Sequence, residues 1–412
     1  MKVKFYTLGC KVNQYETEAL REEFKASGFS ITEKIADIYV INSCSVTAKA
    51  DSDSRRLILK AKKENPKAKV AVCGCLPQLN TETIKKFGAD YIVSQDKKQS
   101  LLDIMKGTSQ AVKDVWSLKI NDFPNQRAFV KIQDGCNNFC SFCKVPYLRG
   151  RSISRPKDEI IKEVARLCAK HKEIILCGVN LGAYGRDLPV KTNLYALLND
   201  LLGYPLLTRL RLSSLEPYSA DKNIIKLFEH PKMCPHIHLP FQNGDNTILK
   251  EMNKKETVEM YEQITSNLRK INPEIAISCD IIVGFPGEDE TSFTNTVNFL
   301  KRVKPMRTHI FTFSPRERTK LYNKKIDPVK VKKRFNQLKA VTDLLALEYK
   351  QAFLGKTLSM VVEEIKSGYA CGYSENYLKI YAKCMASPGE IIAVRIGKVD
   401  KDNIFGVIEK NQ

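Results

Sequence analysis

The chain has 412 residues, enough for two or three domains with cores of their own. Lys and Arg number 67 against 46 Asp and Glu, and the net charge of +21 favours a polyanionic partner such as nucleic acid, with a lysine-rich surface as the alternative. No apolar run reaches membrane-spanning length, and thirteen cysteines without a secretory leader predict a cytoplasmic protein whose clustered thiols bind metal or catalyse.

The chain up to about residue 110 alternates short strands with helices, which predicts a parallel sheet. We expect strands at 2–8, 37–41, 69–73 and 91–93, and helices at 16–25, 49–63 and 81–87. Cys10, Cys44 and Cys75 come just after three of these strands. Because the carboxyl ends of parallel strands share one edge, where ligands bind, three thiolates could meet there around one cluster. Packing of buried cysteines is the alternative, and it suits Cys73, which lies inside a strand.

Residues 112–127 are interpreted as a linker, after which an apolar strand leads into Cys136, Cys140 and Cys143. Three closely spaced soft ligands without a histidine suit zinc or an iron–sulfur cluster. Structural zinc takes four protein ligands, so a zinc site would need a remote fourth ligand. A 4Fe–4S cluster held by three cysteines instead leaves one iron open to another ligand, and we favour this interpretation.

A second series of strands and helices begins near residue 128. We expect strands at 129–133, 173–177, 209–212, 236–239, 276–283 and 309–313, with helices at 156–170, 193–202, 257–270 and 290–301. Six such units are too few for a full eight-stranded barrel and predict an open, partial barrel with its chemistry at the carboxyl ends of the strands. His238 and His309 lie near these ends, where packing explains them as well as ligand contact does. The other candidates there are Asn180, Ser213, Ser214, Glu216, Gln242 and Asp280, with Gly284 and Gly287 as sites of close backbone approach to a ligand.

Four cations stand beside or just after the second group of cysteines, namely Lys144, Arg149, Arg151 and Arg155. Guanidinium groups match phosphate oxygens with two parallel hydrogen bonds, so the arginines are candidates for holding substrate phosphates. A solvated loop at a helix entry is the alternative. A lysine next to a cluster ligand could also shift the potential of the cluster.

The last part of the chain begins with a long helix at 328–354. Strands expected at 357–365, 377–384 and 390–399, separated by turn signals, predict a small β-barrel. Tyr373, Tyr377 and Tyr381 are candidates for stacking on bases, although tyrosines in strands more often pack in a barrel core. We expect the central barrel to hold its cofactor pocket without this last domain.

Motifs at residues 7–16, 41–47, 72–78 and 134–150 surround the two groups of cysteines. They resemble the cysteine motifs of the methylthiotransferase family of radical S-adenosylmethionine (SAM) enzymes, with Lys144 where relatives commonly carry an apolar residue. The final segment, with its Gly372-Tyr-Ser-Glu-Asn-Tyr377 turn, resembles the TRAM domain. The resemblance implies an α/β chain with a parallel cluster domain at 1–111, a linker at 112–127, a partial (βα)6 radical SAM core at 128–352 and a TRAM-like RNA-binding β-barrel at 353–412.

The resemblance also implies the cofactors, which are two 4Fe–4S clusters and SAM. Cys10, Cys44 and Cys75 would hold one cluster, Cys136, Cys140 and Cys143 the other, and the strand-end candidates would line the SAM pocket. In this family one SAM methylates a sulfur on the open iron of the first cluster. A second SAM, cleaved at the other cluster, gives a 5′-deoxyadenosyl radical that removes hydrogen from carbon 2 of an adenine. No further acid or base is needed, because no side chain could break such a bond.

The wording of residues 9–16 and 146–151 resembles the branch that acts on N6-threonylcarbamoyladenosine next to the anticodon of tRNA. Its substrate carries a carboxylate, for which Lys144, Arg149 and Arg151 are candidate contacts. Alternatives are isopentenyl-adenosine in tRNA, an aspartate of a ribosomal protein and, remotely, a non-enzymatic metal-containing RNA-binding protein. We expect tRNA and an electron donor such as flavodoxin or ferredoxin as partners, whereas the sulfur donor stays open.

Overall fold

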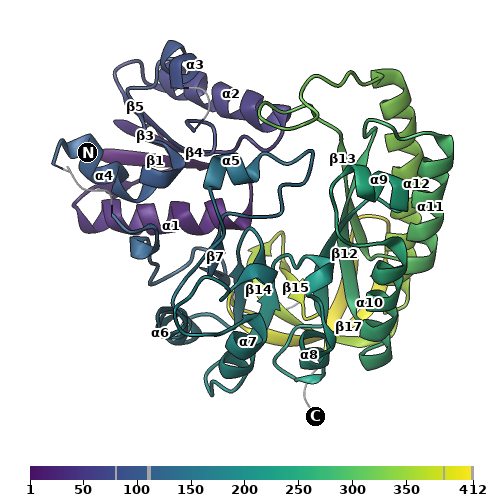
Figure 1. The fold of residues 1–412 in the computed structure, drawn as a ribbon. Helices are drawn as coiled ribbons and strands as arrows, with labels where there is room; N and C mark the ends of the chain where they lie inside the picture. The colour runs from purple at the N-terminus through teal and green to yellow at the C-terminus, as the bar shows by residue number, and fades with distance from the viewer. Residues whose placement is uncertain (79–80, 109–112, 384–385, 410–412) are drawn as a thin grey trace.

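The computed structural model of the chain describes residues 1–78, 81–108, 113–383 and 386–409. It forms an N-terminal sheet, a central open barrel and a closed C-terminal barrel (Figure 1). The N-terminal sheet has the strand order β2-β1-β3-β4-β5 with all neighbours parallel, which confirms the expected parallel sheet. Its strands are β1 (Lys2–Thr7), β2 (Ser30–Ile31), β3 (Ile38–Ser43), β4 (Lys69–Gly74) and β5 (Tyr91–Ile92), and its helices are α1 (Lys11–Ala26), α2 (Ala48–Glu64), α3 (Thr81–Lys86) and α4 (Leu101–Lys106).

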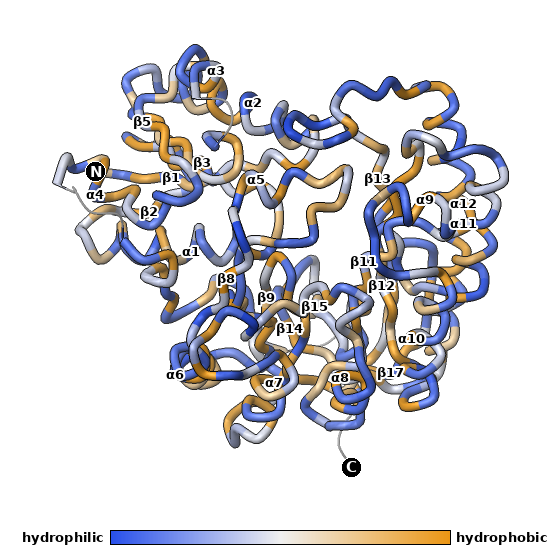
Figure 2. The backbone as a smooth tube through the Cα atoms, viewed as in Figure 1, coloured by the Kyte–Doolittle hydropathy of each residue, from blue (hydrophilic) through white to orange (hydrophobic). Residues whose placement is uncertain are grey.

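The N-terminal sheet is buried on both faces, as parallel sheets are when helices cover them. Every residue of β3 is buried. Alternate residues of this strand face different cores, so Val40 packs with Leu20 of α1, whereas Tyr39 packs with Ile58 of α2. Figure 2 shows the strands of this sheet mostly in the hydrophobic colour, while the loop after β13 (Arg307–Thr312) is mostly hydrophilic.

The segment expected as a linker is packed against the rest of the protein. Leu118, Ile120 and Phe123 are buried in the main core. The side chain of Glu22 in α1 accepts hydrogen bonds from the backbone nitrogens of Asn121 and Asp122. The described part of this segment is therefore packed against both units that it connects. The expected boundary at residues 111 and 112 lies outside the described residues.

The central unit is an open barrel of six parallel strands, as the sequence predicts. Two three-stranded sheets, β10-β9-β6 and β11-β12-β13, meet where the backbone nitrogen of Leu215 donates to the carbonyl of His238 at 2.9 Å. The strands not yet given are β6 (Arg127–Lys131), β9 (Glu173–Cys177), β10 (Arg209–Leu212), β11 (His236–Gln242) and β12 (Ala276–Val283). The main outer helices are α6 (Lys157–Cys168), α7 (Leu194–Leu202), α10 (Val258–Ile271), α11 (Glu290–Val303) and α12 (Pro328–Gln351). The described residues contain no helix that is both long and apolar enough to span a membrane.

Shorter elements complete the path of the chain. Near the cysteine loop, β7 (Gln133–Asp134) pairs with β8 (Ile153–Ser154) in an antiparallel ribbon, and α5 (Val145–Arg149) follows the loop. Two short helices, α8 (Lys222–Lys226) and α9 (Asn246–Glu251), precede β11 and α10 respectively. The 3₁₀ helices are η1 (Gln95–Ser100), η2 (Val115–Ser117), η3 (Leu181–Ala183), η4 (Pro217–Ser219) and η5 (Leu227–Glu229).

The C-terminal unit is a closed five-stranded barrel in the order β14-β15-β16-β18-β17. Three strands were expected, so the sequence pattern missed β15 and β18, and the expected end at residue 384 lies outside the described residues. The missed β15 contains Gly372, where a Cβ atom would meet the carbonyl oxygen of Val361 at 1.9 Å. A glycine that lets two strands cross closely weakens the strand signal in the sequence. The strands are β14 (Thr357–Lys366), β15 (Tyr369–Ser374), β16 (Lys379–Lys383), β17 (Ile391–Val399) and β18 (Ile404–Ile408).

The C-terminal barrel is docked on the amino-terminal ends of the central strands by aromatic and ionic contacts. The ring of Tyr377 lies 4.5 Å from the ring of His236, and the guanidinium carbons of Arg211 and Arg127 lie 4.8 and 5.4 Å from its centre. Arg127 also bonds to Glu363 at 2.6 Å. Tyr377 is therefore a docking residue, and this corrects its interpretation as a base-stacking residue.

Candidate functional site

Three cysteines meet at the carboxyl edge of the N-terminal sheet, and we call Cys10, Cys44 and Cys75 the sheet triad. They follow β1, β3 and β4, which are direct neighbours in the sheet. Gly9 has φ of +94°, and a Cβ atom there would meet the Cβ of Cys44 at 2.9 Å. A glycine at this position therefore lets the first two cysteine loops touch.

Burial keeps the thiols of Cys44 and Cys75 protonated in the absence of a cation. Burial and the neighbouring Cys75 raise the pKa of Cys44 to about 11. Burial also raises the pKa of Cys75. The positive charge of Arg149 lowers this pKa but does not outweigh burial. A buried thiol loses its proton readily only when a metal centre binds the sulfur and compensates the negative charge.

The second group of cysteines, which we call the barrel triad, consists of Cys136, Cys140 and Cys143 in the loop between β7 and α5. Burial raises the pKa of Cys140 to about 12 and that of Cys143 to about 11. The amide nitrogen of Asn180 lies 3.7 Å from the sulfur of Cys136. The amide oxygen of Asn180 is buried and has no hydrogen-bond partner among the residues that the structure describes. Such an acceptor could take a hydrogen bond from a bound ligand, and the expected contact of Asn180 with SAM stays a prediction.

The spacing of the cysteines argues against closed zinc sites. Sulfurs bound to one tetrahedral zinc at 2.3 Å would lie about 3.8 Å apart. Among the described residues, one group of three potential metal ligands has its atoms within 4.8 Å of one another, and it contains no cysteine. Neither cysteine triad therefore has its three sulfurs as close together as the ligands of one zinc ion.

A buried cation that the sequence analysis missed lies next to the barrel triad. The ammonium nitrogen of Lys254 lies 2.6 Å from the carboxylate of Glu216 and 3.3 Å from that of Glu256, with the Lys254 side chain 2% exposed. Burial raises the pKa of Glu216, whereas the two carboxylates and Cys140 raise the pKa of Lys254 despite its burial. Lys254 is thus a fixed positive charge beside the cluster loop, and only the fold brings it there.

The remaining SAM candidates differ in what they can contact. Ser213 and Ser214 are half-buried after β10, and Gln242 adopts φ of +68° at a bulge in β11. Gly287 has open space around it, whereas a Cβ atom at Gly284 would meet Val331 of α12 at 2.2 Å. The close approach at Gly284 thus serves helix packing, and its expected contact with a ligand stays a prediction.

Asp280 points toward two imidazoles inside the barrel. Its carboxylate oxygens lie 3.2 Å from Nε2 of His238 and 3.3 Å from Nδ1 of His309. Burial raises the pKa of Asp280, but the two imidazoles outweigh it and hold this pKa well below its usual range. Asp280 is therefore a carboxylate at neutral pH.

A cavity of about 240 Å³ lies between the regions of the two triads. It is reached by Val46 just after Cys44, by the cluster ligand Cys143 and by the barrel strands. Its walls are largely apolar, and Lys144 and Arg316 supply its cations. The full lining comprises Val46, Thr47, Phe142, Cys143, Lys144, Gln242, Asp280, Ile282, Phe311, Phe313, Ser314 and Arg316.

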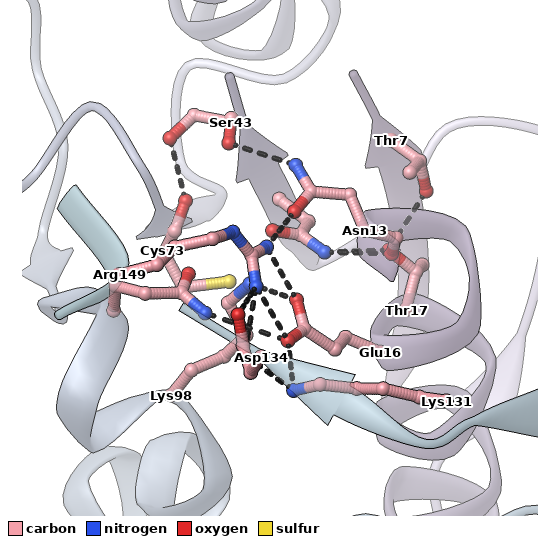
Figure 3. Close-up of polar contacts among 12 residues, drawn as sticks. Thr7, Asn13, Glu16, Thr17, Ser43, Cys73, Lys98, Lys131, Asp134 and Arg149 are labelled. Atoms are coloured by element: carbon pink, nitrogen blue, oxygen red, sulfur yellow. Dashed lines mark hydrogen bonds and ion pairs between the residues drawn. The ribbon is translucent and has the colours of Figure 1, made fainter. Parts of the chain in front are cut away.

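Arg149 lies in a buried charge cluster that joins the two triads (Figure 3). Its guanidinium donates to Asp134 at 2.9 Å, to Glu16 at 3.1 Å and to the amide oxygen of Asn13 at 2.5 Å. Glu16 and Asn13 belong to α1, which begins at the first cysteine motif, whereas Asp134 and Arg149 flank the barrel triad. The side chain is 3% exposed, so the expectation that Arg149 binds substrate is wrong.

Two lysines complete this cluster. Lys98 and Lys131 bond to the carboxylate of Glu16 at 2.5 and 2.7 Å, and Lys131 also bonds to Asp134 at 2.6 Å. The cluster therefore contains three cations, counting Arg149, and two carboxylates, those of Glu16 and Asp134. Its net charge is +1. The positive charges of Arg149 and Lys98 act on the thiol of Cys75, so the cluster would offset part of the negative charge of a metal centre at the sheet triad.

The two other arginines of this region have opposite environments. Arg155 is 1% exposed and holds both oxygens of Glu163 at 3.0 Å, while the hydroxyl of Tyr15 donates to the same carboxylate. Its interpretation as a substrate contact is therefore wrong. Arg151 is exposed, with its guanidinium 5.1 Å from the centre of the Phe139 ring, so it stays available beside the cluster loop.

Known proteins resemble the chain in both of its cysteine-bearing units. Residues 2–94 match the profile of "Uncharacterized protein family UPF0004", and residues 130–300 match that of the "Radical SAM superfamily". A protein of Bacillus subtilis named "Threonylcarbamoyladenosine tRNA methylthiotransferase MtaB" is 36% identical, over 96% of this chain and 94% of its own. The chain belongs to the radical SAM methylthiotransferases. For this methylthiotransferase the family implies a 4Fe–4S cluster and SAM, which the donor set of the barrel triad fits.

Further relatives carry either the same substrate name or a different one. The protein of Aquifex aeolicus with the MtaB name is 36% identical, over 96% of this methylthiotransferase and 100% of its own chain. A "tRNA-2-methylthio-N(6)-dimethylallyladenosine synthase" of Fervidobacterium nodosum is 32% identical over 100% and 99% of the two chains. Among solved structures, the radical SAM methyltransferase TsrM of Kitasatospora setae has a TM-score of 0.56 at 14% identity and covers 75% of this chain and 72% of its own, which shows the fold alone.

Proposed function

We propose that this methylthiotransferase acts on tRNA and converts N6-threonylcarbamoyladenosine next to the anticodon to its 2-methylthio derivative. The observation that carries the proposal is the cavity between the two triads, with a buried lysine in a largely apolar lining. The relatives with the MtaB name support it by their substrate name. Phe142 and Phe311 in this lining supply apolar surface of the kind on which bases stack.

Lys144 is the residue that would distinguish the substrates. It is 4% exposed, and burial, followed by the charge of Arg316, lowers its pKa. Within the described part of the chain its ammonium makes no ion pair or hydrogen bond, while Arg316 bonds to Asp51. The carboxylate of the threonylcarbamoyl group would pair with Lys144, whereas an isopentenyl group would leave a buried charge uncompensated.

The two triads would hold one 4Fe–4S cluster each, with the open iron of the sheet triad as the site of the sulfur to be inserted. When bound, the cluster of the barrel triad supplies the electron that cleaves SAM to a 5′-deoxyadenosyl radical. Asn180 would bind a polar end of SAM beside that cluster, because its amide oxygen has no partner among the described residues. Lys254, which is paired with Glu216 and Glu256, would add a positive charge nearby without contacting SAM. The largely apolar walls of the cavity would keep water from the reacting carbon.

The partners follow from charge and chemistry. The net charge of +21 attracts tRNA, and the exposed Arg151 beside the cluster loop would contact its backbone. A small one-electron donor such as flavodoxin or ferredoxin would reduce the cluster. We place the protein in the cytoplasm, where thiols stay reduced. The sulfur donor is left open.

The test compares two tRNAs with purified, anaerobically reconstituted enzyme. We expect tRNA with threonylcarbamoyladenosine to gain the methylthio group in nucleoside mass spectrometry and isopentenylated tRNA to stay unchanged. Lys144→Met should lower kcat/KM on the first tRNA about 10- to 150-fold, as the loss of a charge-assisted hydrogen bond does. The matched control is Lys191→Met, which removes an exposed lysine before α7.

Two outcomes would contradict the proposal. A preference for isopentenylated tRNA would place the enzyme in the other tRNA branch. Methylthiolation of a ribosomal protein with neither tRNA modified would remove the RNA assignment.

A further inference from the structure

Three potential metal ligands face one another across neighbouring strands of the central barrel. They are His238 of β11, Asp280 of β12 and His309 of β13, and we call them the lumen triad. Asp280 is the direct partner of His309 in the strand register, and β11 pairs with β12 on the other side. Because paired strands fix the positions of their side chains, the arrangement is built into the sheet.

The distances within the lumen triad suit one metal ion. Two ligand atoms each about 2.1 Å from an ion lie about 3.0–3.4 Å apart for octahedral or tetrahedral angles. Oδ2 of Asp280 lies 3.2 Å from Nε2 of His238 and Oδ1 lies 3.3 Å from Nδ1 of His309, so both separations fall in this interval for a carboxylate that binds the ion through both oxygens. Both are longer than the 2.7–2.9 Å that is usual for hydrogen bonds to a charged group. All three ligand atoms lie within 4.8 Å of one another.

A second contact sets the orientation of one ligand. Nδ1 of His238 lies 2.9 Å from the hydroxyl of Ser278, which leaves Nε2 toward Asp280. An outer hydrogen bond of this kind is a regular feature of metal-binding histidines. Ser278 also lies 3.0 Å from Nε2 of His236, so its own position is fixed.

The lumen triad is accessible on one side. Its side chains are 11, 23 and 48% exposed for His238, Asp280 and His309, and Asp280 lines the cavity between the cysteine triads. An ion held here would have three protein ligands and free positions for an outer ligand, as two-histidine, one-carboxylate sites have. Its charge would compensate Asp280 and, through the barrel, Glu216, whose pKa Asp280 helps to raise.

We propose that His238, Asp280 and His309 form a binding site for one divalent transition-metal ion of the manganese, iron, cobalt or zinc type. Imidazole nitrogens favour these ions over magnesium and calcium. The site is separate from both cysteine triads and uses Asp280 for the ion in place of the SAM contact that the family resemblance implied. The open positions would take an anionic oxygen of the molecule in the cavity. This last step rests on the proposed function, whereas the metal site itself does not.

The test is a titration of the reconstituted holoenzyme with Mn²⁺, after passage over a chelating resin and without tRNA or SAM. Free Mn²⁺ is read from its six-line electron paramagnetic resonance signal, with the clusters in their oxidised, silent state. We expect one Mn²⁺ per chain to disappear from the free signal. His309→Ala and Asp280→Asn should each weaken this binding at least about tenfold.

His309→Ala removes a side chain that is about half exposed, and Asp280→Asn keeps the shape of the side chain, so a loss of fold is not expected from either. The matched control is His230→Ala, a histidine outside the lumen triad, which should bind Mn²⁺ as the unchanged enzyme does. Iron content and cluster absorption of each variant show whether it is folded. Equal Mn²⁺ binding by all four proteins, or no binding by the unchanged enzyme, would overturn the proposal. Because no tRNA is present, either result is independent of the substrate assignment.

Discussion

Replacement of Arg149 by glutamine should destabilise the contact between the N-terminal sheet and the central barrel. The change leaves Asp134 with one buried cation, Lys131, which it shares with Glu16. Breaking a buried ion pair by removal of one partner costs about 3–5 kcal/mol. Because Lys98 and Lys131 still compensate Glu16, we take the lower end, about 3 kcal/mol. For a folding unit of about 150–250 residues, such as the central barrel, this loss of free energy of unfolding corresponds to a Tm lower by about 6–12 °C.

The assay is thermal and urea unfolding of the anaerobic, metal-free protein, followed by circular dichroism. Arg149→Lys keeps the charge but loses the planar pair of donors, so it should fall between the wild type and Arg149→Gln. Arg151→Gln is the matched control, because the side chain of this exposed arginine contacts the Phe139 ring and makes no ion pair within the described residues. The ring contact contributes about 0.5–1 kcal/mol.

The reasoning also makes a statement about coupling. Glu16→Gln and Arg149→Gln together should cost about 1–3 kcal/mol less than the sum of the two single changes, since each removes the partner of the other. Equal effects of the Arg149 and Arg151 changes would refute the view that the buried cluster holds the two units together.

Three further predictions follow from the same contacts. Alanine at all three cysteines of the barrel triad should halve the iron content, from about eight to about four irons per chain, and abolish SAM cleavage. The control Cys73→Ala should leave the iron content unchanged. Stoichiometric zinc without visible charge-transfer absorption would contradict this prediction. Burial, followed by the charge of Arg211, holds the pKa of His236 well below its usual range. The contribution of neutral His236 to stability is therefore fully present above pH 6.5. As the pH falls below 6.5, the free energy of unfolding decreases by up to about 1.4 kcal/mol per pH unit. His236→Gln should flatten the pH dependence of the Tm between pH 7.5 and 5.5, and parallel curves would argue against it. In the same unfolding assay, Tyr377→Ala should lower the free energy of unfolding by about 3–5 kcal/mol, and Tyr377→Phe by less than about 1.5 kcal/mol. Similar losses for the two variants would contradict a stabilising role of the Tyr377 ring.

The positions of the cysteines could be predicted because they depend on strand order alone. Cys10, Cys44 and Cys75 follow parallel strands, and the ends of such strands always meet at one edge. The fate of the arginines could not be predicted in this way. Arg149 finds its partner Glu16 at a distance of 133 residues in the chain, and burial of both depends on how the two units dock.

Other parts of the site were also beyond sequence reasoning. Lys254 becomes relevant only because the loop before α10 brings it to Glu216, 38 residues away in the chain. The strand signal of β15 is weakened by Gly372, which lets β15 approach the paired strand β14 closely beside a bulge. Local patterns therefore predict elements and their ends, while long-range contacts decide which charges are buried.

The contact of Tyr377 with the central barrel has a consequence for the modularity of the enzyme. Arg209 bonds to Ser359 at 2.5 Å and Arg211 donates to the carbonyl of Ser374, so two buried cations of the catalytic barrel have partners in the last domain. A chain cut near Gly355 would expose these cations together with His236. We therefore expect the central barrel to lose stability in such a fragment, whereas the sequence predicts that it holds its cofactor pocket without the last domain. Loss of tRNA modification in such a fragment would report damage to the catalytic unit rather than a missing RNA contact, and the outward-facing Tyr381 is the better position at which to separate the two.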